Sequence, residues 1–106
     1  MSYLPRFSHF TLPLLCLASV ASGCAPALSP AGAQLREAAP DAVGECMFLG
    51  TVVGNVGRFD PSPIDDAKID ALNRAAAKGA SRVVWASVSA GRGATAMARA
   101  YRCSGG

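Results

Sequence analysis

Three stretches of the chain have the patterns of hydrophobic residues that are typical of β-strands. Residues 46–53 form an apolar run that is partly β-branched or aromatic and lies between Gly44 and Gly54. Because both faces of this run are largely apolar, it predicts a strand in the middle of a sheet. Residues 82–88 predict a second strand. Residues 94–103 predict a third, since alanine occupies every second position in its first part.

The same alternation predicts which side chains share a face. In the first strand, a period of two places Phe48 on the same face as Val52. In the last strand, the alanines from Ala94 to Ala100 share one face, which allows a helix to pack closely against the sheet. The opposite face of the last strand carries Thr95, Met97, Arg99, Tyr101 and Cys103.

A helix is expected between the first two of these strands. Residues 54–63 are rich in Gly, Asn, Asp and Pro, which predicts a loop. The helix then begins at Pro63, with Ser62 as its N-cap and two aspartates in its first turn. Gly79 is the expected C-terminal cap. Apolar residues at helical spacing predict a buried stripe that comprises Ile69, Leu72 and Ala76.

Together these elements predict an α+β fold. We expect a small single domain over residues 41–106, in which one helix packs on a three- to four-stranded, mainly antiparallel sheet in the order (β)βαββ. Residues 34–38 are the candidate for the additional first strand. Residues 89–93 are expected to form the hairpin loop between the last two strands. A chain of this length supports one hydrophobic core.

The beginning of the chain has the pattern of an export signal. Arg6 precedes an apolar run over residues 10–20, and small residues follow the run. The run is too short to cross a bilayer as a helix, which takes roughly 20 apolar residues. Residues 21–24 read Ala-Ser-Gly-Cys and resemble the cleavage site of bacterial lipoproteins, which implies that residues 1–23 are a lipoprotein signal peptide and that Cys24 is acylated. Ordinary cleavage without lipid is the alternative, because the small residues also fit that rule.

Cleavage at this site changes the chemistry of the chain. It removes His9, which is the only histidine, together with Cys16 and Arg6. Nine of the ten basic residues and all seven acidic residues then remain, which gives a weak excess of positive charge. Residues 24–40 contain several prolines and alanines and are expected to be a tether between the lipid and the domain. Ala25 favours the outer membrane, since lipoproteins retained at the inner membrane usually carry aspartate at that position.

Two thiols, Cys46 and Cys103, are left besides the lipidated cysteine. An exported protein meets an oxidising compartment, and a small domain gains most from a covalent link, so a disulfide between them is expected. Two free buried thiols and a redox-active pair are the alternatives. The wide spacing of the two cysteines argues against a redox pair, because such cysteines are usually close in sequence.

Three segments carry a resemblance to a known family. Residues 46–54 resemble the Cys-x-x-Leu-Gly-x-Val-x-Gly motif of small bacterial outer-membrane lipoproteins of unknown function. Residues 72–83 and residues 100–103 resemble later motifs of that family, although Ser81 stands where asparagine is common. The RcsF stress-sensor lipoprotein is more distantly similar, with two disulfides where this chain can form one. The resemblance covers residues 33–103 and implies the same fold and a bridge between the two remaining cysteines, but no established activity.

The mature chain offers few groups for catalysis. Without a histidine it cannot form a Ser-His or Cys-His pair, and its glycines lack the spacing of a nucleotide-binding motif. The helix dipole accounts for Asp65 and Asp66, and packing accounts for Trp85 and Tyr101. We therefore expect no enzyme activity, no cofactor and no metal site.

The remaining candidate features are a membrane anchor and a basic strand. Arg92, Arg99 and Arg102 are the candidate surface contacts. The expected partners are the lipid bilayer, through acylated Cys24, and an envelope protein, but no nucleic acid. The expected function is that of a non-enzymatic cell-envelope lipoprotein, a sensor, adaptor or structural component on the periplasmic side of the outer membrane. A periplasmic thiol redox protein and a binder of a small anionic ligand are the alternatives.

Overall fold

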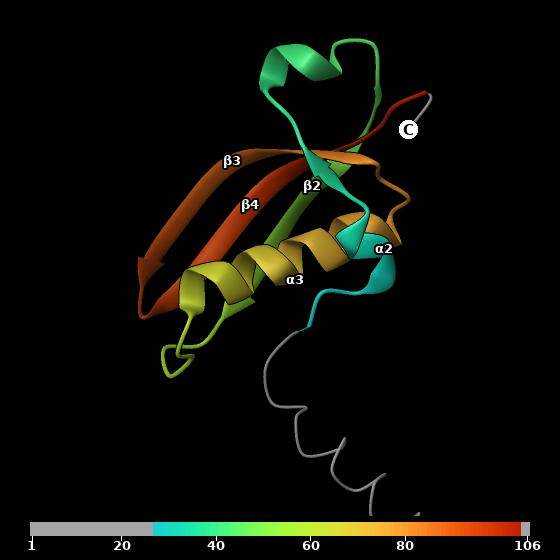
Figure 1. Cartoon of the computed structure of the whole chain (residues 1–106). Coiled ribbons are helices and arrows are strands. Elements are labelled where there is room, and N and C mark those ends of the chain that lie inside the picture. Colours follow the sequence, from blue (N-terminus) through green and yellow to red (C-terminus); the bar gives the residue numbers. More distant parts are fainter. Residues whose placement is uncertain (1–26, 105–106) are drawn as a thin grey trace, which may run out of the picture.

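A computed structural model describes residues 27–104 of the chain. The expected signal peptide and Cys24 lie outside the described residues. Figure 1 shows one long helix, α3, lying across one face of a curved sheet, with the short helix α2 beside it. In chain order the elements are α2 (Pro30–Ala33), β1 (Arg36–Glu37), the 3-10 helix η2 (Pro40–Val43), β2 (Met47–Val56), α3 (Pro63–Ala77), β3 (Arg82–Gly91) and β4 (Gly93–Arg102).

The four strands form one sheet in the order β1-β3-β4-β2. Strand β4 lies in the middle and pairs antiparallel with both β2 and β3, whereas β1 pairs parallel with β3. The predicted α+β fold, with one main helix on a mostly antiparallel four-stranded sheet, is confirmed. The predicted place of the first long strand is wrong, because β2 is an edge strand and not a strand in the middle of the sheet.

Local signals explain both ends of α3. Pro63 occupies the first turn and Ser62 the N-cap position, as predicted, but the Ser62 side chain makes no capping hydrogen bond. At the other end, Gly79 has a positive φ of 89°. Its N–H donates to the carbonyl of Ala76 (2.9 Å), and the N–H of Ala80 donates to the carbonyl of Ala75 (3.2 Å). This pair of bonds is a Schellman motif, for which glycine is the favoured residue.

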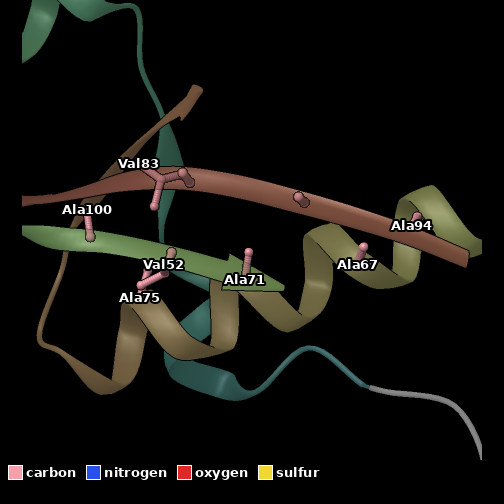
Figure 2. Packing of buried hydrophobic residues seen from close by; sticks show 9 residues of the cluster. Val52, Ala67, Ala71, Ala75, Val83, Ala94 and Ala100 are labelled. Carbon is pink, nitrogen blue, oxygen red and sulfur yellow. The ribbon is translucent and has the colours of Figure 1, made fainter. Parts of the chain in front are cut away.

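The core between α3 and the sheet is a layer of alanines. Ala67, Ala71 and Ala75 of α3 are fully buried and belong to one cluster with Val52, Val83 and the alternate alanines of β4 (Figure 2). The alanine face predicted for the last strand is therefore present. The predicted stripe on the helix is wrong, since the side chains that were assigned to it are only half-buried: Ile69, Leu72 and Ala76.

Gly54 of β2 explains why alanines fill this layer. A Cβ atom on Gly54 would overlap the carbonyl oxygen of Ala67 and come within 2.5 Å of the backbone nitrogen of Ala71. The helix backbone thus lies directly on the strand, which leaves no space for a leucine or isoleucine beneath the helix. Larger apolar side chains, such as Leu72, pack at the border of the layer instead.

A bulge in β2 reverses the face of its first residues. Phe48 pairs with Tyr101 and Gly50 pairs with Ala100, so Leu49 is an extra residue relative to β4. Gly50 has a φ of 131°, a conformation that favours glycine. Because one extra residue shifts the alternation, Phe48 lies on the face of Tyr101, whereas strict alternation placed it on the face of Val52. That prediction is wrong.

Residues 27–40 are folded against the domain. The N–H of Ser29 donates to Oδ1 of Asn73 (2.8 Å), and Nδ2 of Asn73 donates to the carbonyl of Ala27 (2.8 Å). Leu35 packs against the core, and β1 matches the extra strand that was considered for residues 34–38. The segment that was expected to be a tether therefore carries α2 and β1. The physical reason is that the side chain of Asn73, far along the chain, hydrogen-bonds the backbone N–H of Ser29 and the backbone carbonyl of Ala27.

The hairpin between β3 and β4 is longer and tighter than predicted. The strands pair as far as Gly91 and Gly93, so Arg92 alone forms the tip of the loop expected over residues 89–93. Gly93 has a φ of 95°, and a Cβ there would overlap the carbonyl oxygen of Val56. Glycine is therefore required at this end of β4.

Candidate functional site

The face of the sheet opposite α3 is the candidate functional site, and we call it the open face. Within residues 27–104, both α2 and α3 lie on the other side of the sheet, and no helix covers the middle of the open face (Figure 1). The registers of the three long strands place residues of each in rows across it. The open face comprises Phe48, Thr51, Val53, Asn55, Arg82, Val84, Ser87, Ser89, Thr95, Met97, Arg99 and Tyr101.

Phe48, Arg99 and Tyr101 form an aromatic–arginine cluster on the open face. The guanidinium carbon of Arg99 lies 4.4 Å from the centre of the Phe48 ring and 5.9 Å from that of Tyr101. Nε of Arg99 donates a hydrogen bond to the hydroxyl of Tyr101 (2.9 Å). The two rings are 5.4 Å apart and tilted by 53°. The cluster thus holds an exposed cation beside two aromatic rings, one of which also accepts its hydrogen bond.

Sequence reasoning identified only part of this cluster. Arg99 was a predicted contact residue, and its alternation with Tyr101 placed both on one face. Phe48 was missed because the bulge at Leu49 was not foreseen. The signal that marks the bulge is Gly50, since a glycine inside a strand often marks an extra residue or a bend. Phe48 keeps 47 % of its surface exposed, which is high for phenylalanine.

The other two predicted arginines lie away from the cluster. Arg92 is exposed at the tip of the β3–β4 hairpin. Arg102 is an odd number of residues from Arg99 on the same strand and therefore points to the opposite face. Its Nε donates to the carbonyl of Gly79 (3.4 Å), just past the C-terminus of α3. A positive charge at this end of the helix interacts favourably with the helix dipole. The structure does not bring the three arginines together.

Cys46 and Cys103 form a disulfide, with their Cα atoms 4.4 Å apart. Cys46 immediately precedes β2 and Cys103 immediately follows β4, so the bridge closes the ends of two paired strands. The N–H of Cys103 also donates to Oγ of Ser81 (3.0 Å). Both cysteines are half-buried beside a shallow hollow at the end of the sheet, which is also lined by Ala42, Glu45, Arg82 and Ser104.

Two aspartates of α3, Asp66 and Asp70, have structural partners. Asp70 accepts a hydrogen bond from the N–H of Asn55 (3.1 Å) and pairs with Arg74 one turn along the helix (3.2 Å). Asp66 is 9 % exposed and shares a hydrogen bond with Asp60. That hydrogen bond raises the pKa of Asp66 above its ordinary value of 3.8, and desolvation and the neighbouring charges act in the same direction.

Substitution of Asp66 tests this carboxyl pair. Because the folded state raises the pKa of Asp66, it holds that proton more tightly than the unfolded chain does. The stabilising contribution is therefore full below about pH 3.8 and is lost as the pH rises through the raised pKa. Asp66→Asn keeps a hydrogen-bond donor at every pH, so its stability relative to the natural protein should increase as the pH rises from 3.5 to about 7.

Thermal unfolding of the two proteins across this pH range gives the measurement. Asp41→Asn in η2 is the control for the loss of one exposed carboxylate. A stability difference between Asp66→Asn and the natural protein that does not vary with pH would contradict the shared hydrogen bond.

Comparisons with known proteins found no match. No protein-family model, curated protein or solved structure matches this chain. Among residues 27–104, none of the helices has both the length and the apolar character needed to span a membrane. The same part of the chain contains no group of three or more His, Cys, Asp or Glu side chains placed to hold a metal ion.

Proposed function

We propose that this protein is a non-enzymatic, lipid-anchored component of the bacterial cell envelope, placed on the periplasmic side of the outer membrane. In this proposal it acts as an adaptor that docks a partner protein on the open face. The lipoprotein-like sequence at residues 21–24 supports the anchor. The resemblance of residues 46–54 and 100–103 to small bacterial lipoproteins supports the envelope location.

The aromatic–arginine cluster is the observation that carries the docking role. Arginine, tyrosine and other aromatic residues supply most of the binding energy in protein interfaces. Here Phe48 and Arg99 are exposed, and Tyr101 holds the arginine in place. An exposed phenylalanine next to an ordered arginine costs solvation and side-chain entropy in the free protein. A partner that covers both side chains would recover that cost.

Several other groups on the described chain have structural explanations. Asp66 and Asp70 of α3 are occupied by Asp60, Arg74 and the backbone of β2, and the disulfide joins the ends of two strands. These assignments support a binding protein over an enzyme.

Site-specific crosslinking tests this proposal in intact envelopes. A photoreactive phenylalanine analogue is placed at Thr51, which is exposed and lies beside Arg99 in the register of β2 and β4. The control places the same analogue at Asp65, which is exposed on α3. We expect a discrete crosslinked protein from position 51 and none from position 65. Equal products from both positions, or none from either, would contradict the docking role.

Fractionation tests the anchor separately. The natural protein is expected in the outer-membrane fraction, and the Cys24→Ala variant in the soluble periplasmic fraction, because a lipoprotein cysteine carries the chains that hold it at the bilayer. Labelling with a clickable fatty acid should give a signal only for the natural protein. A natural protein without this label would show ordinary cleavage and would reject the anchor.

The disulfide supports one second candidate, a thiol redox protein. The observation in its favour is that Cys46 and Cys103 are both partly exposed beside a hollow, where a reductant can reach them. Reduction would take two electrons and two protons and give two thiols. The reduction potential of the bridge separates the candidates, because structural disulfides have potentials below about −300 mV, whereas redox-active ones are more oxidising.

A further inference from the structure

We propose that the partner presents an acidic segment, and that one of its carboxylates binds Arg99 within the aromatic–arginine cluster. This inference rests on the proposed docking role of the open face and names the chemistry of the partner. The cluster would bind the carboxylate through the outer nitrogens of the guanidinium, while the rings of Phe48 and Tyr101 cover the flanking part of the segment.

The first argument is the distribution of charge over the fold. All seven acidic residues of the chain lie in β1, in η2, in the loops or in α3, and strands β2, β3 and β4 contain none. The same three strands carry Arg82, Arg99 and Arg102. Of these, Arg99 lies in the aromatic–arginine cluster, and none of the open-face residues is acidic. The cluster therefore presents a positive charge, and a partner of complementary charge is negative.

The second argument is that Arg99 is ordered but keeps free donors. Its Nε is occupied by Tyr101, and its guanidinium plane lies near the Phe48 ring. The two outer nitrogens carry N–H groups in one plane. These groups can donate two parallel hydrogen bonds to a carboxylate. Since Phe48 and Tyr101 already restrict the long side chain, binding costs less conformational entropy than it would for a mobile arginine.

The surroundings of Arg99 favour a protein segment over a lipid surface. Attachment to anionic lipids usually takes a cluster of four to eight basic residues, whereas the open face has two arginines among apolar and uncharged polar side chains. Thr51, Val53 and Met97 extend from the cluster along the sheet. A surface with one ordered cation and two aromatic rings resembles the centre of a protein interface.

Variants of Arg99 test the proposal in the crosslinking system described above. Arg99→Gln should lower the yield of the product from position 51 by about tenfold or more, because a hydrogen bond to a charged group contributes about 1.5–3 kcal/mol and each 1.4 kcal/mol is a factor of ten. Arg99→Lys keeps the charge without the fork and should give an intermediate yield. Arg92→Gln, at the hairpin tip, is the matched control and should leave the yield unchanged.

Three further readouts complete the test. Mass spectrometry of the crosslinked peptide should identify a segment of the partner that contains Asp or Glu. Thermal melting should place Arg99→Gln within about 4 °C of the natural protein, since an exposed substitution has little effect on folding. Vesicles containing 30 % phosphatidylglycerol should not bind the soluble Cys24→Ala protein in a manner that depends on Arg99.

The outcomes separate this proposal from the docking role itself. A product from position 51 whose yield is unchanged in Arg99→Gln, or whose crosslinked segment lacks acidic residues, would overturn the acidic-segment proposal and leave the docking role intact. Binding to the vesicles that depends on Arg99 would overturn it in favour of a lipid headgroup. The absence of any product from position 51 in the natural protein would overturn both.

Discussion

Gly54→Ala is expected to lower the free energy of unfolding by about 3 kcal/mol, at the upper end of the range for overpacked cores. The added Cβ would meet the backbone of α3 at Ala67 and Ala71, which cannot rotate away as a flexible side chain can. The helix would have to move off the sheet and expose part of the alanine layer. Such a loss is large compared with the total stability of a small domain, about 5–15 kcal/mol.

Urea unfolding of the variant, followed by circular dichroism, gives the measurement. Gly44→Ala is the matched control, because a Cβ at Gly44 meets nothing within 4 Å and its φ of −60° suits alanine. We expect this control to be neutral or stabilising by up to about 1 kcal/mol, since alanine restricts the unfolded chain. A loss below about 1 kcal/mol for Gly54→Ala would contradict the close approach of helix and strand.

Removing the disulfide is expected to cost about 4 kcal/mol, because the bridge restricts the unfolded chain over a sequence separation of 57 residues. The variant Cys46→Ala with Cys103→Ala removes both thiols, so no free cysteine of the domain complicates refolding. Chemical unfolding of this variant should give the same stability as the reduced natural protein. A cost below about 1 kcal/mol would show that strand pairing alone keeps the ends of β2 and β4 together.

The natural protein, which has the bridge, also tests the redox alternative. Equilibration with thiol buffers of known potential gives the reduction potential of the bridge. We expect a value below about −300 mV, which would identify a structural disulfide. A value near −200 mV would instead support the redox role, because the bridge would then exchange electrons readily with its compartment.

Some parts of the fold follow from local sequence signals. Pro63 and Gly79 mark the ends of α3 because the proline removes a backbone donor that the helix does not need and the glycine accepts a positive φ. The alanines of β4 recur with the period of a strand, and they do face the helix. These features depend on each residue and its near neighbours, which is why the sequence alone predicts them.

Other parts depend on contacts that sequence patterns do not contain. Hydrophobicity favoured Ile69 and Leu72 for the buried stripe, but the distance between α3 and β2 is set by Gly54 and admits only alanine. The register of β2 against β4, including the bulge at Leu49, decides the face of Phe48. The sequence therefore predicted one contact residue of the candidate site, Arg99. It did not predict Phe48, whose ring lies closest to the Arg99 guanidinium.

The attachment of Ala27 to Asn73 limits how far the domain can move from a membrane. Ala27 is the third residue after Cys24, and an extended chain spans at most about 3.6 Å per residue, so the two are joined by at most about 11 Å of chain. With Cys24 acylated, the domain would stay at the bilayer surface. The protein would then reach little further from the membrane than its own width. A partner for the open face would have to come to the membrane to bind it.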